Sequence, residues 1–117
     1  MTKRAQTRQR AAGGGAGAED SDLEIFQAAS EMVVEIDRRY RLAKINDKVK
    51  LKPERDRAFT AYTLARLRLL EDGMLTDEED LAEMEALKEE MDKAAATQDL
   101  IIAAARVAAF LAKLALK

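Results

Sequence analysis

The densest group of side chains that could do chemistry is a run of carboxylates in residues 78–92. Two carboxylates held at a suitable distance can work as a general acid and a general base. The run includes Glu78, Glu79, Glu83, Glu85, Glu89, Glu90 and Asp92. All of them belong to one predicted helix with an apolar opposite side, so we interpret them as a solvated acidic face.

The residues that usually accompany acid–base or metal chemistry are missing from the sequence. The chain has no His and no Cys, which excludes an imidazole base, a thiol nucleophile and an ordinary zinc site. A carboxylate metal site between helices usually also uses His. The serines are Ser21 and Ser30 alone, and Ser21 is expected to cap a helix. We therefore predict no catalytic residue, no metal and no cofactor, and a protein that is not an enzyme.

Basic residues form two groups that could contact phosphates. The first lies in an acid-free N-terminal segment and comprises Lys3, Arg4, Arg8 and Arg10. The second comprises Arg38, Arg39, Arg41, Lys44, Lys48, Lys50 and Lys52. A basic arm together with a basic patch is a nucleic-acid footprint. Against this interpretation, the pI is about 5.3, and Tyr40 falls on an apolar stripe, where it is a core residue rather than a platform for stacking bases.

The C-terminal segment 100–117 is nearly all apolar apart from one line of cations. Arg106, Lys113 and Lys117 are spaced by 7 and 4, which places them on one side of a helix. A narrow cationic strip on a wide apolar helix is typical of the membrane interface, but the abundant alanines favour a core or an oligomer seam. The predicted contact face comprises Leu100, Ile101, Ala104, Ala108, Leu111 and Ala115.

The elements that must position these groups are all helical. We predict a disordered, basic, Gly-rich arm over 1–20 and a helical domain over 21–117, because the arm lacks large apolar residues after Met1. Ser21 and Glu24 form a capping-box pattern that starts a helix over 21–46. Residues 46–52 alternate like a strand but have no partner strand, so we expect a loop there. Pro53 then fits the first turn of a helix over 53–72.

A helical hairpin is predicted around residues 71–76. Gly73 suits a helix C-terminus, and Thr76 with Glu79 repeats the capping box, which predicts a third helix over 76–96. Since no Gly or Pro follows before the end, the pattern favours its continuation through 97–116 as one rod of about 60 Å over two separate helices. The expected fold is all-α, an up-down bundle of three or four helices with a long C-terminal helix.

The formal net charge of −2 conceals strongly charged blocks. Residues 38–57 hold nine bases and three acids, and residues 71–93 hold eleven acids and two bases. With 23 Ala among its 117 residues, such a chain buries little area per residue and leaves apolar surface for a partner. We predict a structural, assembly or adaptor protein that self-associates through its C-terminal helix. The alternatives are nucleic-acid binding and membrane association through 100–117. With no signal or membrane-spanning segment, we expect a cytoplasmic location.

Overall fold

The computed structural model describes residues 15–72 and 76–117, and this part of the chain contains four helices and no strand. The helices are α1 (Gly15–Leu42), α2 (Ile45–Asp72), α3 (Glu78–Lys93) and α4 (Thr97–Ala115). The predicted all-α class is confirmed. Most of the predicted basic arm, residues 1–14, lies outside the described residues, as does Gly73.

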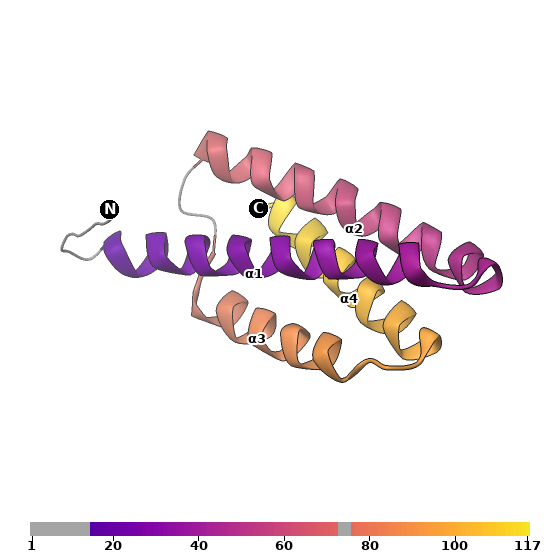
Figure 1. The fold of residues 1–117 in the computed structure, drawn as a ribbon. Coiled ribbons are helices and arrows are strands. Elements are labelled where there is room, and N and C mark those ends of the chain that lie inside the picture. Colours follow the sequence, from indigo (N-terminus) through magenta and orange to yellow (C-terminus); the bar gives the residue numbers. More distant parts are fainter. Residues whose placement is uncertain (1–14, 73–75) are drawn as a thin grey trace, which may run out of the picture.

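The helices run back and forth along a molecule 51 Å long (Figure 1). α1 and α2 form a hairpin, α3 returns along α1, and α4 crosses behind α1 to reach α2. The most extensive packing is between α2 and α4. Within the described residues α2 and α3 make no contact with each other, so the helical hairpin predicted at 71–76 is wrong. The fourth helix, not the third, covers the inner side of α2.

The core is built from large side chains of α1, α3 and α4 and mostly small side chains of α2. The largest fully buried side chains include Ile25 and Ile36 of α1, Met84 of α3 and Phe110 of α4. Apart from Leu51, α2 contributes alanines, namely Ala58, Ala61 and Ala65. α4 contributes Ala103, Ala104 and Ala108 in addition to its large residues. Methyl side chains let two helices approach closely, which accounts for the extensive packing of α2 on α4.

The boundaries of α1 and α2 differ from the predicted ones. α1 begins at Gly15 and passes through Ser21, so Ser21 is not an N-cap, and α1 ends at Leu42 rather than near Asn46. Residues 46–52 are helical, not a loop. In a strand Val49 and Leu51, which are two residues apart, would share one face, whereas in a helix they fall on opposite sides. Leu51 is buried and Val49 is exposed, which is the arrangement expected of a helix.

Pro53 lies inside α2 rather than at its start. A proline in a helix has no N–H to offer the carbonyl four residues earlier, here that of Val49. The side chains of both residues are exposed. Water can therefore reach the carbonyl that the proline leaves without its helical donor, and the helix continues past it.

The N-cap of α3 is one residue later than the predicted cap. Asp77, not Thr76, is the N-cap: its carboxylate accepts from the backbone N–H of Asp80 at 2.9 Å, and the Asp80 carboxylate accepts from the N–H of Asp77 at 3.2 Å. This is a capping box built from two aspartates. The hydroxyl of Thr76 instead donates a hydrogen bond to the carboxylate of Asp22 in α1.

The predicted continuous rod over 76–116 is also wrong. Ala94 and Ala96 adopt extended backbone angles, and the chain reverses between α3 and α4. The reason lies in the phase of the two apolar stripes. Met91 and Leu100 are nine residues apart, which is about 2.5 turns of a helix, so an unbroken helix would hold them on opposite sides. Breaking the helix lets both face the core, where both are buried.

Candidate functional site

An apolar groove of about 640 Å³ runs along the outer side of the contact between α2 and α4. Its α2 wall includes Ala61 and Leu64, with Glu54 and Arg57 near one end. Its α4 wall comprises Ala105, Ala108, Ala109, Ala112, Ala115 and Leu116. Because alanine methyl groups line most of the α4 wall, a helix laid along the groove can come close to the backbone of α4.

A row of exposed leucines stands beside this groove on α2. Leu64, Leu67 and Leu70 each leave half or more of their surface in water, and we call them the leucine ridge. Leu64 also lines the groove, so ridge and groove share an edge. Together they offer on the order of a few hundred Å² of apolar surface, a size at which exposed patches commonly mark interaction sites.

The face of α4 predicted to carry self-association or membrane contact points inward instead. Leu100, Ala104, Ala108 and Leu111 are buried, and Ile101 and Ala115 are partly buried against the core. Of these six residues Ala108 and Ala115 also line the groove, and the rest of the face is covered by the other helices. The outward side of α4 carries Ala109, Ala112 and Leu116. Alanine spacing did not distinguish the two sides, because α4 has alanines on both.

The cationic strip of α4 is paired with the acidic face of α3. Arg106 contacts Glu90 at 3.1 Å, and Lys113 contacts Glu83 at 2.6 Å. The hydrogen bond from Lys113 to the Glu83 carboxylate raises the pKa of Lys113. Lys117 is bonded to Asp80. Acidic residues 78–92 thus serve in part to hold α4, which explains the strip without a membrane surface.

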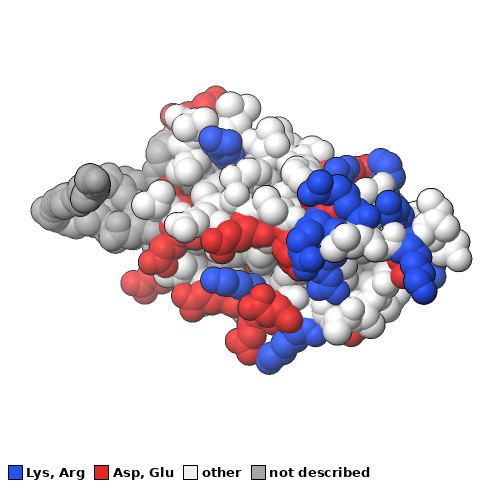
Figure 2. Space-filling model, in the orientation of Figure 1, with Lys and Arg blue, Asp and Glu red and all other residues white. Residues whose placement is uncertain are grey.

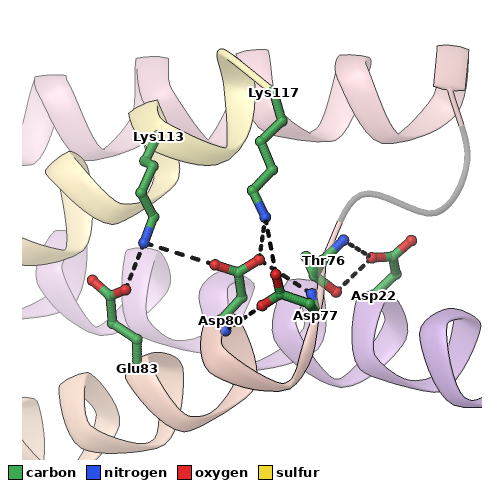
Figure 3. Close-up of polar contacts among 7 residues, drawn as sticks. All are labelled: Asp22, Thr76, Asp77, Asp80, Glu83, Lys113 and Lys117. Atoms are coloured by element: carbon green, nitrogen blue, oxygen red, sulfur yellow. Dashed lines mark hydrogen bonds and ion pairs between the residues drawn. The ribbon is translucent and has the colours of Figure 1, made fainter.

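A polar cluster closes the end of the molecule where α3 begins (Figure 3). Asp80 is almost fully buried and has Lys117 and Lys113 as partners, the latter at 3.7 Å. Asp22 of α1 accepts hydrogen bonds from the backbone N–H of Thr76 at 2.8 Å and from its hydroxyl at 2.6 Å. The backbone N–H of Asp80 lowers the pKa of Asp77. These contacts join α1, α3 and α4, and we call them the closed end.

The second predicted basic group gathers at the opposite end, where α1 turns into α2. Figure 2 shows Lys and Arg concentrated at this end and acidic residues along α3. Several of its members have partners within the chain. Arg38 contacts Glu35, Arg41 contacts Asp37, and Lys52 contacts Asp56. In the described residues Lys44, Lys48 and Lys50 form no ion pair, and the first group, Lys3 to Arg10, lies outside the described residues.

Arginine contacts hold this end of the hairpin together. The guanidinium of Arg55 donates to Asp37 of α1 at 2.8 and 3.0 Å and to Asp56 at 2.9 Å. It also lies 5.1 Å from the centre of the Tyr40 ring. These hydrogen bonds, first to Asp37 and then to Asp56, raise the pKa of Arg55. Tyr40 is partly buried against the core, as predicted. Arg39 donates to the carbonyl of Ala95 at 3.0 Å, which ties α1 to the turn before α4.

The described residues contain neither a group of carboxylates placed to hold a metal ion nor a helix that could span a membrane. No group of three or more Asp or Glu in 15–72 and 76–117 is placed to hold a metal ion. None of the helices there is long and apolar enough to cross a membrane. In comparisons with known proteins, no family model, no curated protein and no solved structure matches the chain.

Proposed function

We propose that this protein is a non-enzymatic structural or assembly protein that pairs with a second copy of itself through the α2–α4 groove. The observation that carries the proposal is the position of the leucine ridge directly beside an alanine-lined groove. In a twofold arrangement the ridge of each copy enters the groove of the other, and one patch supplies both halves of the contact.

The chemistry of the patch supports a second copy over a charged partner. The middle of the groove is lined by Ala, Thr and Leu, with its charged residues at one end. Apolar centres with polar edges are the usual composition of interfaces between identical chains. This interface differs from the predicted face of α4, with which it shares Ala108 and Ala115, and it adds the exposed side chains of Leu64, Ala109 and Ala112.

The test is the mass of the protein in solution, measured by size-exclusion chromatography with light scattering. We expect a mass of about 26 kDa, twice the 13.0 kDa of one chain, with dissociation on dilution. Changing Ala109→Lys with Ala112→Lys should give a monomer, because both side chains are exposed and would place charges in the groove. Leu64→Gln with Leu67→Gln should do the same from the ridge.

Two matched variants control for a general effect of substitution. Ala82→Lys with Ala86→Lys alters exposed alanines of α3, and Leu23→Gln with Val34→Gln alters exposed apolar residues of α1. Both should keep the mass of the unmodified protein. A monomer for the unmodified chain at high micromolar concentration, or dimers that persist in both groove and ridge variants, would contradict the proposal.

A further inference from the structure

The turn between α1 and α2 exposes aliphatic side chains in the middle of its positive charge. Leu42 and Ile45 are each 73% exposed, and Val49 is 68% exposed. They lie at the end of α1 and in the first two turns of α2. None of them belongs to the core cluster. Folding therefore leaves three large apolar side chains in water at one end of the molecule, without using them for stability.

The surroundings of these three residues are strongly basic. Residues 41–52 hold Arg41, Lys44, Lys48, Lys50 and Lys52 against one acid, Asp47. The charges of Lys44, Lys48 and Lys50 are not neutralised by an ion pair in the described residues, although Lys48 lies 5.8 Å from the Tyr40 ring centre. We call residues 41–52 the basic tip, and Figure 2 shows Lys and Arg gathered at the right-hand side of the molecule.

We propose that the basic tip docks on an anionic lipid surface, with Leu42, Ile45 and Val49 entering the boundary between headgroups and acyl chains. Lysines near an anionic leaflet are attracted to it over a short range, and aliphatic side chains gain by leaving water. The tip provides both at one place. The surface is formed by the α1–α2 turn and the start of α2, not by α4, whose apolar side is buried.

A nucleic acid would contact the lysines of this surface favourably but not its aliphatic side chains. Phosphates would attract the lysines, but exposed aliphatic side chains make no favourable contact with a phosphate backbone. Recognition of single strands relies on aromatic stacking platforms. Here Tyr40 is partly buried, and the Arg55 guanidinium lies over the rings of both Tyr40 and Phe59. The combination of exposed Leu, Ile and Val with lysines therefore favours lipid.

The test measures binding of the full chain to phosphatidylcholine vesicles with and without phosphatidylserine. It is carried out in a background in which Lys3, Arg4, Arg8 and Arg10 are changed to Gln, so that the N-terminal bases do not contribute. We expect binding to the phosphatidylserine vesicles alone. Changing Lys44, Lys48 and Lys50 to Gln should weaken it by on the order of a hundredfold.

A second variant tests the aliphatic half of the tip. Changing Leu42, Ile45 and Val49 to Gln should weaken vesicle binding by about tenfold or more. The matched controls are Leu23, Val34 and Ile102 changed to Gln, which are also exposed, and Arg66, Lys88 and Lys93 changed to Gln, which remove the same charge. Both controls should bind as the background protein does, and all variants should unfold cooperatively.

Several results would overturn the docking proposal. Absence of binding in this background would do so, as would equal binding to both kinds of vesicle or equal losses in tip variants and controls. Binding to duplex DNA that depends on the three lysines, with vesicle binding unaffected by the aliphatic changes, would assign the tip to nucleic acid instead. The inference is independent of self-association, because the groove variants keep the tip intact and should still bind vesicles.

Discussion

The two ends of the molecule treat their charges in opposite ways. At the closed end, the carboxylates of Asp22 and Asp80 are buried and bonded to Thr76, Lys113 and Lys117. At the basic tip, three lysines have no ion pair within the described residues and stand beside exposed aliphatic side chains. The charged groups of the closed end form contacts between helices. Those of the tip contribute little to the fold and remain available to another surface.

The largest effect on stability is expected at Asp80. Asp80→Ala removes one half of the capping box and leaves Lys113 and Lys117 without their buried partner. We expect the free energy of unfolding to fall by about 3 kcal/mol, near the lower limit for breaking a buried ion pair because both lysines are partly exposed. Urea denaturation measures this loss. Glu85→Ala, at an exposed position of α3, is the control and should change it little.

A smaller loss is expected at Asp22. Asp22→Ala leaves the buried N–H and hydroxyl of Thr76 without the acceptor they share. An unsatisfied buried donor costs roughly 1–3 kcal/mol, so we expect a loss of about 2 kcal/mol. Asp22→Asn keeps an oxygen acceptor and should lose less. If Asp22→Ala unfolds at the same urea concentration as the exposed control Glu24→Ala, the closed end does not stabilise the fold in this way.

The smallest effect on stability is expected at the tip. Changing Lys44, Lys48 and Lys50 together to Gln should shift the free energy of unfolding by no more than about 0.5 kcal/mol, the usual range for surface positions without special contacts. The single change Lys113→Gln, at a paired lysine near the closed end, should cost about as much as or more than all three. A triple variant as unstable as Asp80→Ala would remove the contrast between the two ends.

Much of the local structure could be predicted from the sequence because it depends on periodicity alone. In the sequence α1 and α3 each have an apolar stripe at helical spacing, with Phe26, Val33 and Ile36 in α1 and Met84, Leu87 and Met91 in α3. All of these side chains are buried. The exposed sides follow from the same patterns, including the acidic face of α3. Each of these predictions needs only the residues of one helix.

The errors arise where two elements must be compared. The break at 94–96 arises because Met91 and Leu100 would lie on opposite sides of an unbroken helix. A search for Gly and Pro alone does not detect a break of this kind. The packing of α2 on α4 depends on how alanines on two distant helices fit, which adjacency in sequence does not reveal. The outward turn of Leu42, Ile45 and Val49 had one visible signal, since these residues leave the stripe that contains Ile36 and Tyr40.

The placement of α4 between α2 and α3 also determines when the fold can be completed. In the described residues α2 and α3 make no contact with each other, whereas α4 packs against both. On the ribosome, α1, α2 and α3 all leave the exit tunnel before α4 does. The surfaces of α1, α2 and α3 that α4 covers therefore stay open to water until α4 emerges. The most extensive contact of the fold, that of α2 on α4, thus waits for the last of the four helices.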